Sequence, residues 1–284
     1  MYKFRSVLIV IGLFLIQPAV LYSETKSFLI QLENQDRTNL NQYISFFRDD
    51  NNQLEFDYIL RQPASSFQNF PENNSDTNLG FSSATHWLRF EFENLTSKKV
   101  NRFLEFAYTR ISYLTFYIPT LDGNYQVIET GNNLPFQTRP YQHRNFIFPL
   151  ILPPESKQVF FFKVNTTSPL IIPVRLWETN AFHKYERDDY FHQALYFGIA
   201  IAMILFNLLL FFSLKDIIYF YYVSFAITMF YSIATKNGLA KEFLWLDSPT
   251  ISNNSSLTAN ALTFITFLLF FSRAVKNLYL HTES

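Results

Sequence analysis

The sequence predicts an all-β sandwich followed by an α-helical membrane segment, and three observations indicate this. Short runs of alternating apolar and polar residues, typical of half-buried strands, follow one another from about residue 27 to residue 177. After residue 181 come a short charged segment and then long apolar runs typical of membrane-spanning helices. Only 16% of the 284 residues are charged, against about 25% in ordinary soluble domains.

The first 23 residues are predicted to be a secretory signal peptide. Lys3 and Arg5 give a basic start, residues 7–16 form an apolar run, and Pro18 ends it before small residues suited to cleavage. The run is too short to span a bilayer, although an uncleaved anchor is the alternative.

Residues 24–181 are predicted to form the extracytoplasmic sandwich. In the stretch 86–93, Leu88, Phe90 and Phe92 share one face while Arg89 lies on the other. Asp122-Gly123 between two strands indicates a hairpin. The span 40–47 fits a helix or a strand, and the span 63–83 reads as a long loop. Further strands are expected at 103–108, 112–118, 125–130, 145–150, 158–165 and 171–177.

Residues 182–284 are predicted to hold a polar collar at 182–192 and three membrane helices, at about 195–214, 217–235 and 256–272. An exported sandwich places Lys215, Arg273 and Lys276 inside the cell and the 236–256 loop outside, which agrees with the positive-inside rule. Asn207, a polar residue within the first span, is predicted to hydrogen-bond across the helix bundle.

Composition and motifs argue against several function classes. The formal net charge is zero and there is no cysteine, so neither nucleic-acid binding nor thiol chemistry is indicated. No phosphate loop, nucleophile elbow or zinc motif occurs, and we predict no enzyme activity, cofactor or metal. His183, Asp188, Asp189 and His192 fit a solvated collar better than a metal site. A hydrolase with two converging carboxylates has no local signature and remains an alternative.

Seven residues are candidates for binding a ligand. Aromatic rings on a sandwich surface can stack on sugars, and arginines add planar donor pairs for hydroxyls or carboxylates. Trp87 and Arg89 lie opposite the predicted core face and are expected to be at least partly exposed. The competing interpretation of each aromatic residue is core packing. The candidates are Trp87, Arg89, Tyr117, Arg139, Tyr141, Arg144 and Trp177.

A series of short motifs runs in one consistent order from about residue 40 to residue 280. In the strand region the motifs are Trp87-Leu88-Arg89-Phe90 with Asn94, Tyr117-Ile118-Pro119 with Asp122-Gly123, Gly131 before Leu134-Pro135-Phe136, Arg139, Arg144, Phe148-Pro149-Leu150 and Trp177. In the helical region they are Tyr196-Phe197-Gly198, Asn207, Leu214-Lys215-Asp216, Tyr219 to Tyr222, Asn237-Gly238 and Leu244-Trp245. In these motifs and their order the chain resembles the bacterial 7TM receptors with diverse intracellular signalling modules, including their second type of extracellular domain.

The resemblance implies a jelly-roll ectodomain, similar to carbohydrate-binding modules, that binds a small molecule or glycan outside the cytoplasm. It implies a multi-pass protein of the inner membrane that signals through a seven-helix bundle. A second copy of the chain or a downstream signalling domain is the implied partner, beside the lipid bilayer. The chain is expected to be truncated after the third helix. The alternative function is a membrane-anchored carbohydrate-binding or scaffold protein without signalling output.

Overall fold

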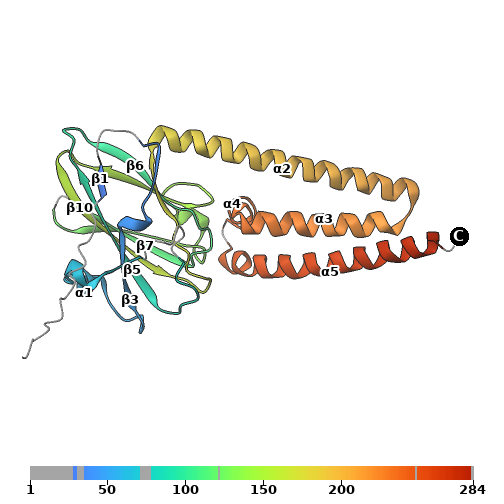
Figure 1. Cartoon of the computed structure of the whole chain (residues 1–284), viewed down its shortest axis with the longest axis horizontal. Coiled ribbons are helices and arrows are strands. Elements are labelled where there is room, and N and C mark those ends of the chain that lie inside the picture. Colours follow the sequence, from blue (N-terminus) through green and yellow to red (C-terminus); the bar gives the residue numbers. More distant parts are fainter. Residues whose placement is uncertain (1–27, 31–34, 71–77, 121, 247, 283–284) are drawn as a thin grey trace, which may run out of the picture.

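The computed structural model describes residues 28–30, 35–70, 78–120, 122–246 and 248–282. They form a β-sandwich joined to a group of long helices that project from one end of it (Figure 1). The predicted signal peptide, residues 1–23, lies outside the described residues.

The described strands of the sandwich form a seven-stranded and a four-stranded sheet. The first runs in the order β4-β3-β5-β10-β7-β8, with β1 paired in parallel to β5, and the second in the order β2-β11-β6-β9. From β5 to β11 the chain changes sheet at every step except β7 to β8, so the predicted sandwich is confirmed. The strands are β1 (Phe28–Ile30), β2 (Arg37–Asn39), β3 (Ile44–Asp49), β4 (Gln68–Asn69), β5 (Thr85–Asn94), β6 (Val100–Phe106), β7 (Tyr113–Pro119), β8 (Tyr125–Thr130), β9 (Phe146–Leu152), β10 (Ser156–Asn165) and β11 (Val174–Glu178).

Two predicted segments differ in detail. In the span 40–47 a short 3-10 turn, η1 (Asn41–Tyr43), precedes β3, so the strand interpretation is correct for the second half. The predicted loop 63–83 contains a 3-10 turn, η2 (Ala64–Ser66), and the short strand β4.

Phenylalanine side chains fill the space between the two sheets. Leu88, Phe90 and Phe92 point into this core, as their alternation predicts, and all are buried. Phe116 and Phe162 stack with ring centroids 4.2 Å apart on paired strands β7 and β10. Each buried ring removes about 150–250 Å² of surface from water, so these side chains contribute much of the hydrophobic stabilisation of the sandwich.

The outer face of the first sheet is covered rather than open. The short helix α1 (Phe56–Leu60) and η2 lie over it, and Phe56 and Phe67 pack around Trp87, which is 0% exposed. The prediction that Trp87 is partly exposed was therefore wrong. Alternation along one strand predicts which face lies in the core. It does not predict whether a segment distant in sequence covers the other face.

The helical part contains α2 (Thr179–Leu214), α3 (Ile217–Lys236), α4 (Leu239–Phe243) and α5 (Pro249–Thr282). Within the described residues, α2, α3 and α5 are long and apolar enough to cross a membrane. The structure differs from the predicted boundaries of two segments. The charged segment 182–192 forms the first turns of α2 rather than a separate collar, and the third helix extends well beyond 256–272 at both ends.

Polar residues define the ends and contacts of the helices. Lys215 takes a left-handed conformation (φ 55°) that ends α2, and the Asp216 side chain accepts a hydrogen bond from the Ile218 amide to start α3. Asn207 donates to the Met203 carbonyl of its own helix, at 2.8 Å, instead of bonding across the bundle. Hydrogen bonds between α3 and α5 join Thr228 to Thr266 and Ser232 to Asn260, both at 2.8 Å.

The tight turn after β8 depends on Gly131, which directly follows that strand. Its φ is +151°, and a Cβ there would overlap the backbone of Ser112. Gly123 also has a positive φ but meets nothing within 4 Å. We expect Gly131→Ala to lower the free energy of unfolding by about 2 kcal/mol more than Gly123→Ala, because strain and backbone overlap add. Unfolding of the purified full chain in detergent measures both variants. Equal effects would contradict the described turn.

Candidate functional site: the junction of sandwich and helices

The last strand of the sandwich continues into the first membrane helix without a linker. Strand β11 ends at Glu178, and α2 begins at Thr179. The Glu178 carboxylate accepts a hydrogen bond from the Ala181 amide at 2.8 Å, which satisfies one free N–H of the helix start. Any displacement of β11 therefore reaches α2 directly.

The first turns of α2 pack on the outer face of the second sheet. Phe182 is buried there against Phe103 and Trp177, and Tyr185 stacks on Trp177 with ring centroids 4.6 Å apart. Apolar packing of this density resists sliding, so α2 is fixed in orientation as well as in position.

A buried carboxylate, that of Glu105, lies beside these aromatic rings on the outer face of the second sheet. The side chain of Glu105 on β6 is 0% exposed and accepts hydrogen bonds from Trp177 Nε1 and Asn145 Nδ2, both at 2.7 Å. Arg175 Nη1 lies 3.5 Å from the same carboxylate. These partners offset the desolvation of the charge and hold the Trp177 ring in place.

Arg144 connects three separate parts of the chain. Its Nε and Nη2 lie 3.1 and 2.7 Å from Asp189 Oδ2 on α2, and its Nη1 donates to the Asn237 carbonyl after α3 at 3.1 Å. The next residue, Gly238, has a φ of +79°, and a Cβ there would lie 2.8 Å from the Thr109 side chain. Glycine thus permits both the turn and its close approach to the sandwich.

The loop that carries Arg144 is held by Arg139. Its guanidinium Nη1 donates to the carbonyls of His143 (2.6 Å), Arg144 (2.6 Å) and Asn145 (3.3 Å). Burial lowers the pKa of Arg139 to about 10, so it keeps its charge at neutral pH. Burial lowers the pKa of His143 to about 3, with the neighbouring arginines acting in the same direction, so this imidazole is neutral.

A second set of contacts joins the sandwich to α4 and the start of α5. Lys241 Nζ donates to the carbonyls of Asn132 and Leu134 at 3.0 and 2.8 Å, and the Phe136 amide donates to the Leu246 carbonyl at 2.8 Å. We call the two contact regions together the junction: the sandwich loops at 107–112 and 131–146 against the first turns of α2, the 235–246 segment and the start of α5.

Carboxylates also meet tyrosine hydroxyls in the junction. Tyr190 on α2 donates to Glu242 on α4 at 2.8 Å, and Tyr141 donates to Glu186 at 2.8 Å. Burial raises the pKa of Glu242, and burial together with Glu186 raises the pKa of Tyr141 to about 12. The Tyr190–Glu242 bond joins α2 to the α3–α5 connection.

The seven predicted ligand residues fall into two groups, one on the outer face of the first sheet and one at the junction. Trp87, Arg89 and Tyr117 lie on the outer face of the first sheet, where Tyr117 stacks on Phe56 at 4.0 Å and Arg89 pairs with Glu91 at 2.6 Å. The other four, Arg139, Tyr141, Arg144 and Trp177, lie at the junction. The two groups cannot contact one ligand.

Sequence reasoning missed most partners of the four junction residues. Asp189 was placed in a solvated collar, Glu242 and Lys241 in an outer loop, and Glu105 in no site. Asp188 pairs with the exposed Arg187 at 3.3 Å, and Asp189 pairs with Arg144. In the described part of the chain no group of three or more His, Cys, Asp or Glu side chains is placed to hold a metal ion.

Two adjacent aspartates on α2 give a matched test of the junction. Asp189→Asn removes the charge that faces the largely buried Arg144, and we expect a loss of about 1.5–3 kcal/mol with faster amide hydrogen exchange in residues 179–192. Asp188→Asn removes a partner of an exposed arginine, and we expect a change below about 0.5 kcal/mol. Chemical denaturation and exchange of the full chain in detergent measure both. The junction would be refuted if Asp188→Asn had the larger effect.

Comparisons with known proteins agree with this division of the chain. Residues 41–178 match the family model described as 7TMR-DISM extracellular 2, and residues 189–283 match the model described as 7TM diverse intracellular signalling. A search of curated proteins finds no similar sequence. The two matches follow one another, and the first turns of α2 separate them. The chain belongs to the 7TM receptors with diverse intracellular signalling modules.

Proposed function

We propose that this chain is the sensory part of a membrane receptor, in which the sandwich binds a small extracytoplasmic ligand and the junction transmits the change to the membrane helices. The observation that carries the proposal is the direct continuation of β11 into α2, fixed by Phe182 on one side and by the Arg144–Asp189 pair on the other. A flexible linker at this point would absorb a movement of the sandwich, whereas this connection passes it on.

Ligand binding changes a receptor only through a difference in affinity between two states. Two regions of the junction can differ between such states: the packing of α2 on the second sheet, and the contacts of α4 and α5 with the sandwich loops. Arg144 and the Tyr190–Glu242 bond couple these regions. A ligand that shifts one region therefore biases the other.

The arrangement of the helices supports an exported sandwich. Helix α4, which lies between α3 and α5, is at the same end of the helices as the sandwich, while the turn between α2 and α3 lies at the far end (Figure 1). With the sandwich in the periplasm, Lys215 lies on the cytoplasmic side of the inner membrane, as the positive-inside rule favours.

A carbohydrate is one proposed ligand class, and the geometry limits where it could bind. Trp87 and Trp177 are covered by other side chains, so neither presents a ring face for stacking on a sugar. Tyr117 on β7 is the remaining aromatic candidate on the first sheet, and β10 separates it from Arg89 on β5. Such a site would need Phe56 to move, because its ring now covers Tyr117.

The orientation can be tested because the chain has no native cysteine. We expect Ser97→Cys, on an exposed sandwich loop, to react with a membrane-impermeant maleimide in spheroplasts. We expect Lys215→Cys to react only after the membrane is broken, because its turn faces the cytoplasm. Labelling of Lys215→Cys in intact spheroplasts, with Ser97→Cys protected, would invert the proposed topology.

Coupling can be tested by hydrogen exchange of the full chain in lipid nanodiscs with a panel of sugars and small organic acids. We expect a panel member that protects sandwich strands also to change exchange in residues 179–192 and 237–252. Protection of the sandwich with an unchanged junction would favour an anchored binding or scaffold protein. A flat response to the whole panel would count against a sensory role.

A further inference from the structure

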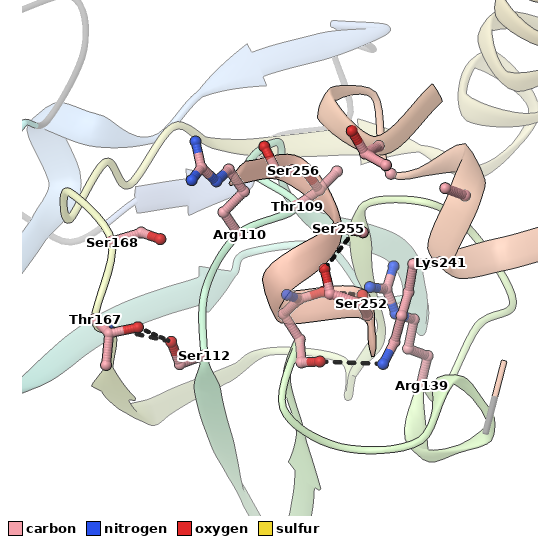
Figure 2. Close-up of a pocket in the computed structure, with 14 residues that line it drawn as sticks. Thr109, Arg110, Ser112, Arg139, Thr167, Ser168, Lys241, Ser252, Ser255 and Ser256 are labelled. Atoms are coloured by element: carbon pink, nitrogen blue, oxygen red, sulfur yellow. Dashed lines mark hydrogen bonds between the residues drawn. The ribbon is translucent and has the colours of Figure 1, made fainter. Parts of the chain in front are cut away.

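Two cavities of different character lie at the junction. The polar one, of about 100 Å³, lies between the sandwich, α4 and the start of α5 (Figure 2). Lys241 donates there to the carbonyls of Asn132 and Leu134, and Ser252 donates to the Asn132 side chain at 3.3 Å. Both of these polar groups are therefore satisfied within the chain. The second cavity, of about 390 Å³, lies between α2, α3 and α4, and we call it the apolar pocket.

Apolar side chains from three helices line the apolar pocket. They include Ala194 and Phe197 on α2, Phe230 on α3 and Phe243 on α4. The rings of Phe197 and Phe230 meet with centroids 4.6 Å apart, and they are the lining residues farthest from the sandwich along their helices. This contact closes the pocket on that side. Phe243 and the following Leu244 are 64% and 57% exposed, so the open rim of the pocket is apolar as well.

Polar side chains lie at the end of the apolar pocket that faces the sandwich. The Tyr190 hydroxyl donates there to the Glu242 carboxylate at 2.8 Å. Gln193 Oε1 accepts from Asn237 Nδ2 at 3.2 Å, and among the described residues no partner bonds the Gln193 amide nitrogen. That nitrogen can therefore donate to an ester or phosphate oxygen of a ligand.

The length of α2 places the apolar pocket where this helix enters the membrane. Residues 195–214 suffice to cross a bilayer core of about 30 Å. Gln193 thus lies on the water side of the boundary and Phe197 on the hydrocarbon side. From Tyr190 to Phe197 the pocket extends about 10 Å along α2. Ile199, which is 59% exposed, continues the apolar surface of α2 beyond the pocket, so pocket and membrane surface are continuous.

Hydrocarbon is the occupant that fits this position. An apolar cavity excludes water, and an empty cavity loses the van der Waals contacts of its walls. We propose that the apolar pocket binds one acyl chain of a phospholipid from the leaflet next to the sandwich, with its headgroup beside Gln193. The volume of 390 Å³ lies in the range of small-molecule pockets, about 300–1,000 Å³, and suits one chain rather than a whole phospholipid.

A bound acyl chain links the membrane to the junction. It contacts α2, α3 and α4 together, and Tyr190 at the polar end joins α2 to α4 through Glu242. The spacing of α2 and α4 therefore depends on whether the pocket is filled. The lipid site follows from the helices alone and does not require that the sandwich bind a ligand.

The test is photo-crosslinking of the full chain in lipid nanodiscs that contain a small fraction of phosphatidylcholine with a diazirine on one acyl chain. We expect the cross-links, mapped by mass spectrometry, to concentrate on the lining residues of the apolar pocket. Ala194→Phe places a ring in the pocket, and we expect it to lower these cross-links by at least about fivefold because the ring occupies the space of the chain. Since Ala194 is exposed, the fold tolerates the larger side chain.

Ala202→Phe is the matched control, because it adds the same ring at an exposed position of α2 that does not line the pocket. We expect it to leave the cross-links at the pocket unchanged. Cross-links spread evenly over the apolar surfaces of α2, α3 and α5, or an equal loss in both variants, would overturn the proposal.

Two further results would assign the pocket to another occupant and overturn the proposal. One is labelling of the pocket by a diazirine-bearing fatty acid with no labelling by the phospholipid. The other is a disulfide-linked dimer of Phe243→Cys under mild oxidation, which would seat a second copy of this otherwise cysteine-free chain at the rim.

Discussion

The architecture of this receptor depends on the guanidinium of Arg144. This one side chain joins the 139–146 loop that carries it to the first turns of α2, through Asp189, and to the end of α3, through the Asn237 carbonyl. A guanidinium can do this because its donors point in several fixed directions in one plane, whereas a lysine offers a single mobile point charge. Arg139 fixes the loop so that Arg144 reaches both targets, and Gly238 brings the α3 end within its reach.

The dimensions of α2 explain why its first turns belong to the junction. A helix of 36 residues is about 54 Å long, whereas the hydrocarbon core of a bilayer is about 30 Å thick. The excess of about 16 residues matches the segment from Thr179 to Ala194, which carries Phe182, Tyr185, Asp189 and Tyr190. Beyond it, side chains such as Leu209 and Phe212 are exposed and suited to lipid or to further helices. One continuous helix thus packs on the sandwich at one end and carries an apolar surface suited to a membrane along the rest of its length.

Local sequence patterns predicted the partition of the chain, the core face of β5 and the apolar spans, because each depends on residues close together in sequence. The candidate site was predicted only in part. Arg139, Tyr141, Arg144 and Trp177 were identified, but their roles as parts of a junction were not. Asp189 and Asn237 lie 45 and 93 residues from Arg144 along the chain, and nothing in their own neighbourhoods indicates the pairing. The cover over Trp87 has the same cause, since Phe56 and Phe67 come from a segment without regular alternation.

The two regions of the junction differ in a way that bears on how a signal would pass. The contact of α2 with the second sheet is centred on aromatic rings, with Phe182, Trp177 and Tyr185 closely packed beside the buried Glu105. The contact of α4 and α5 is polar, relies on hydrogen bonds such as that of Lys241, and encloses a cavity. Close-packed apolar surfaces rearrange at a high cost, whereas polar contacts around a cavity can exchange partners with water or a ligand at little cost. The α2 contact is therefore suited to stay unchanged between two states of the receptor, and the α4–α5 contact is suited to rearrange.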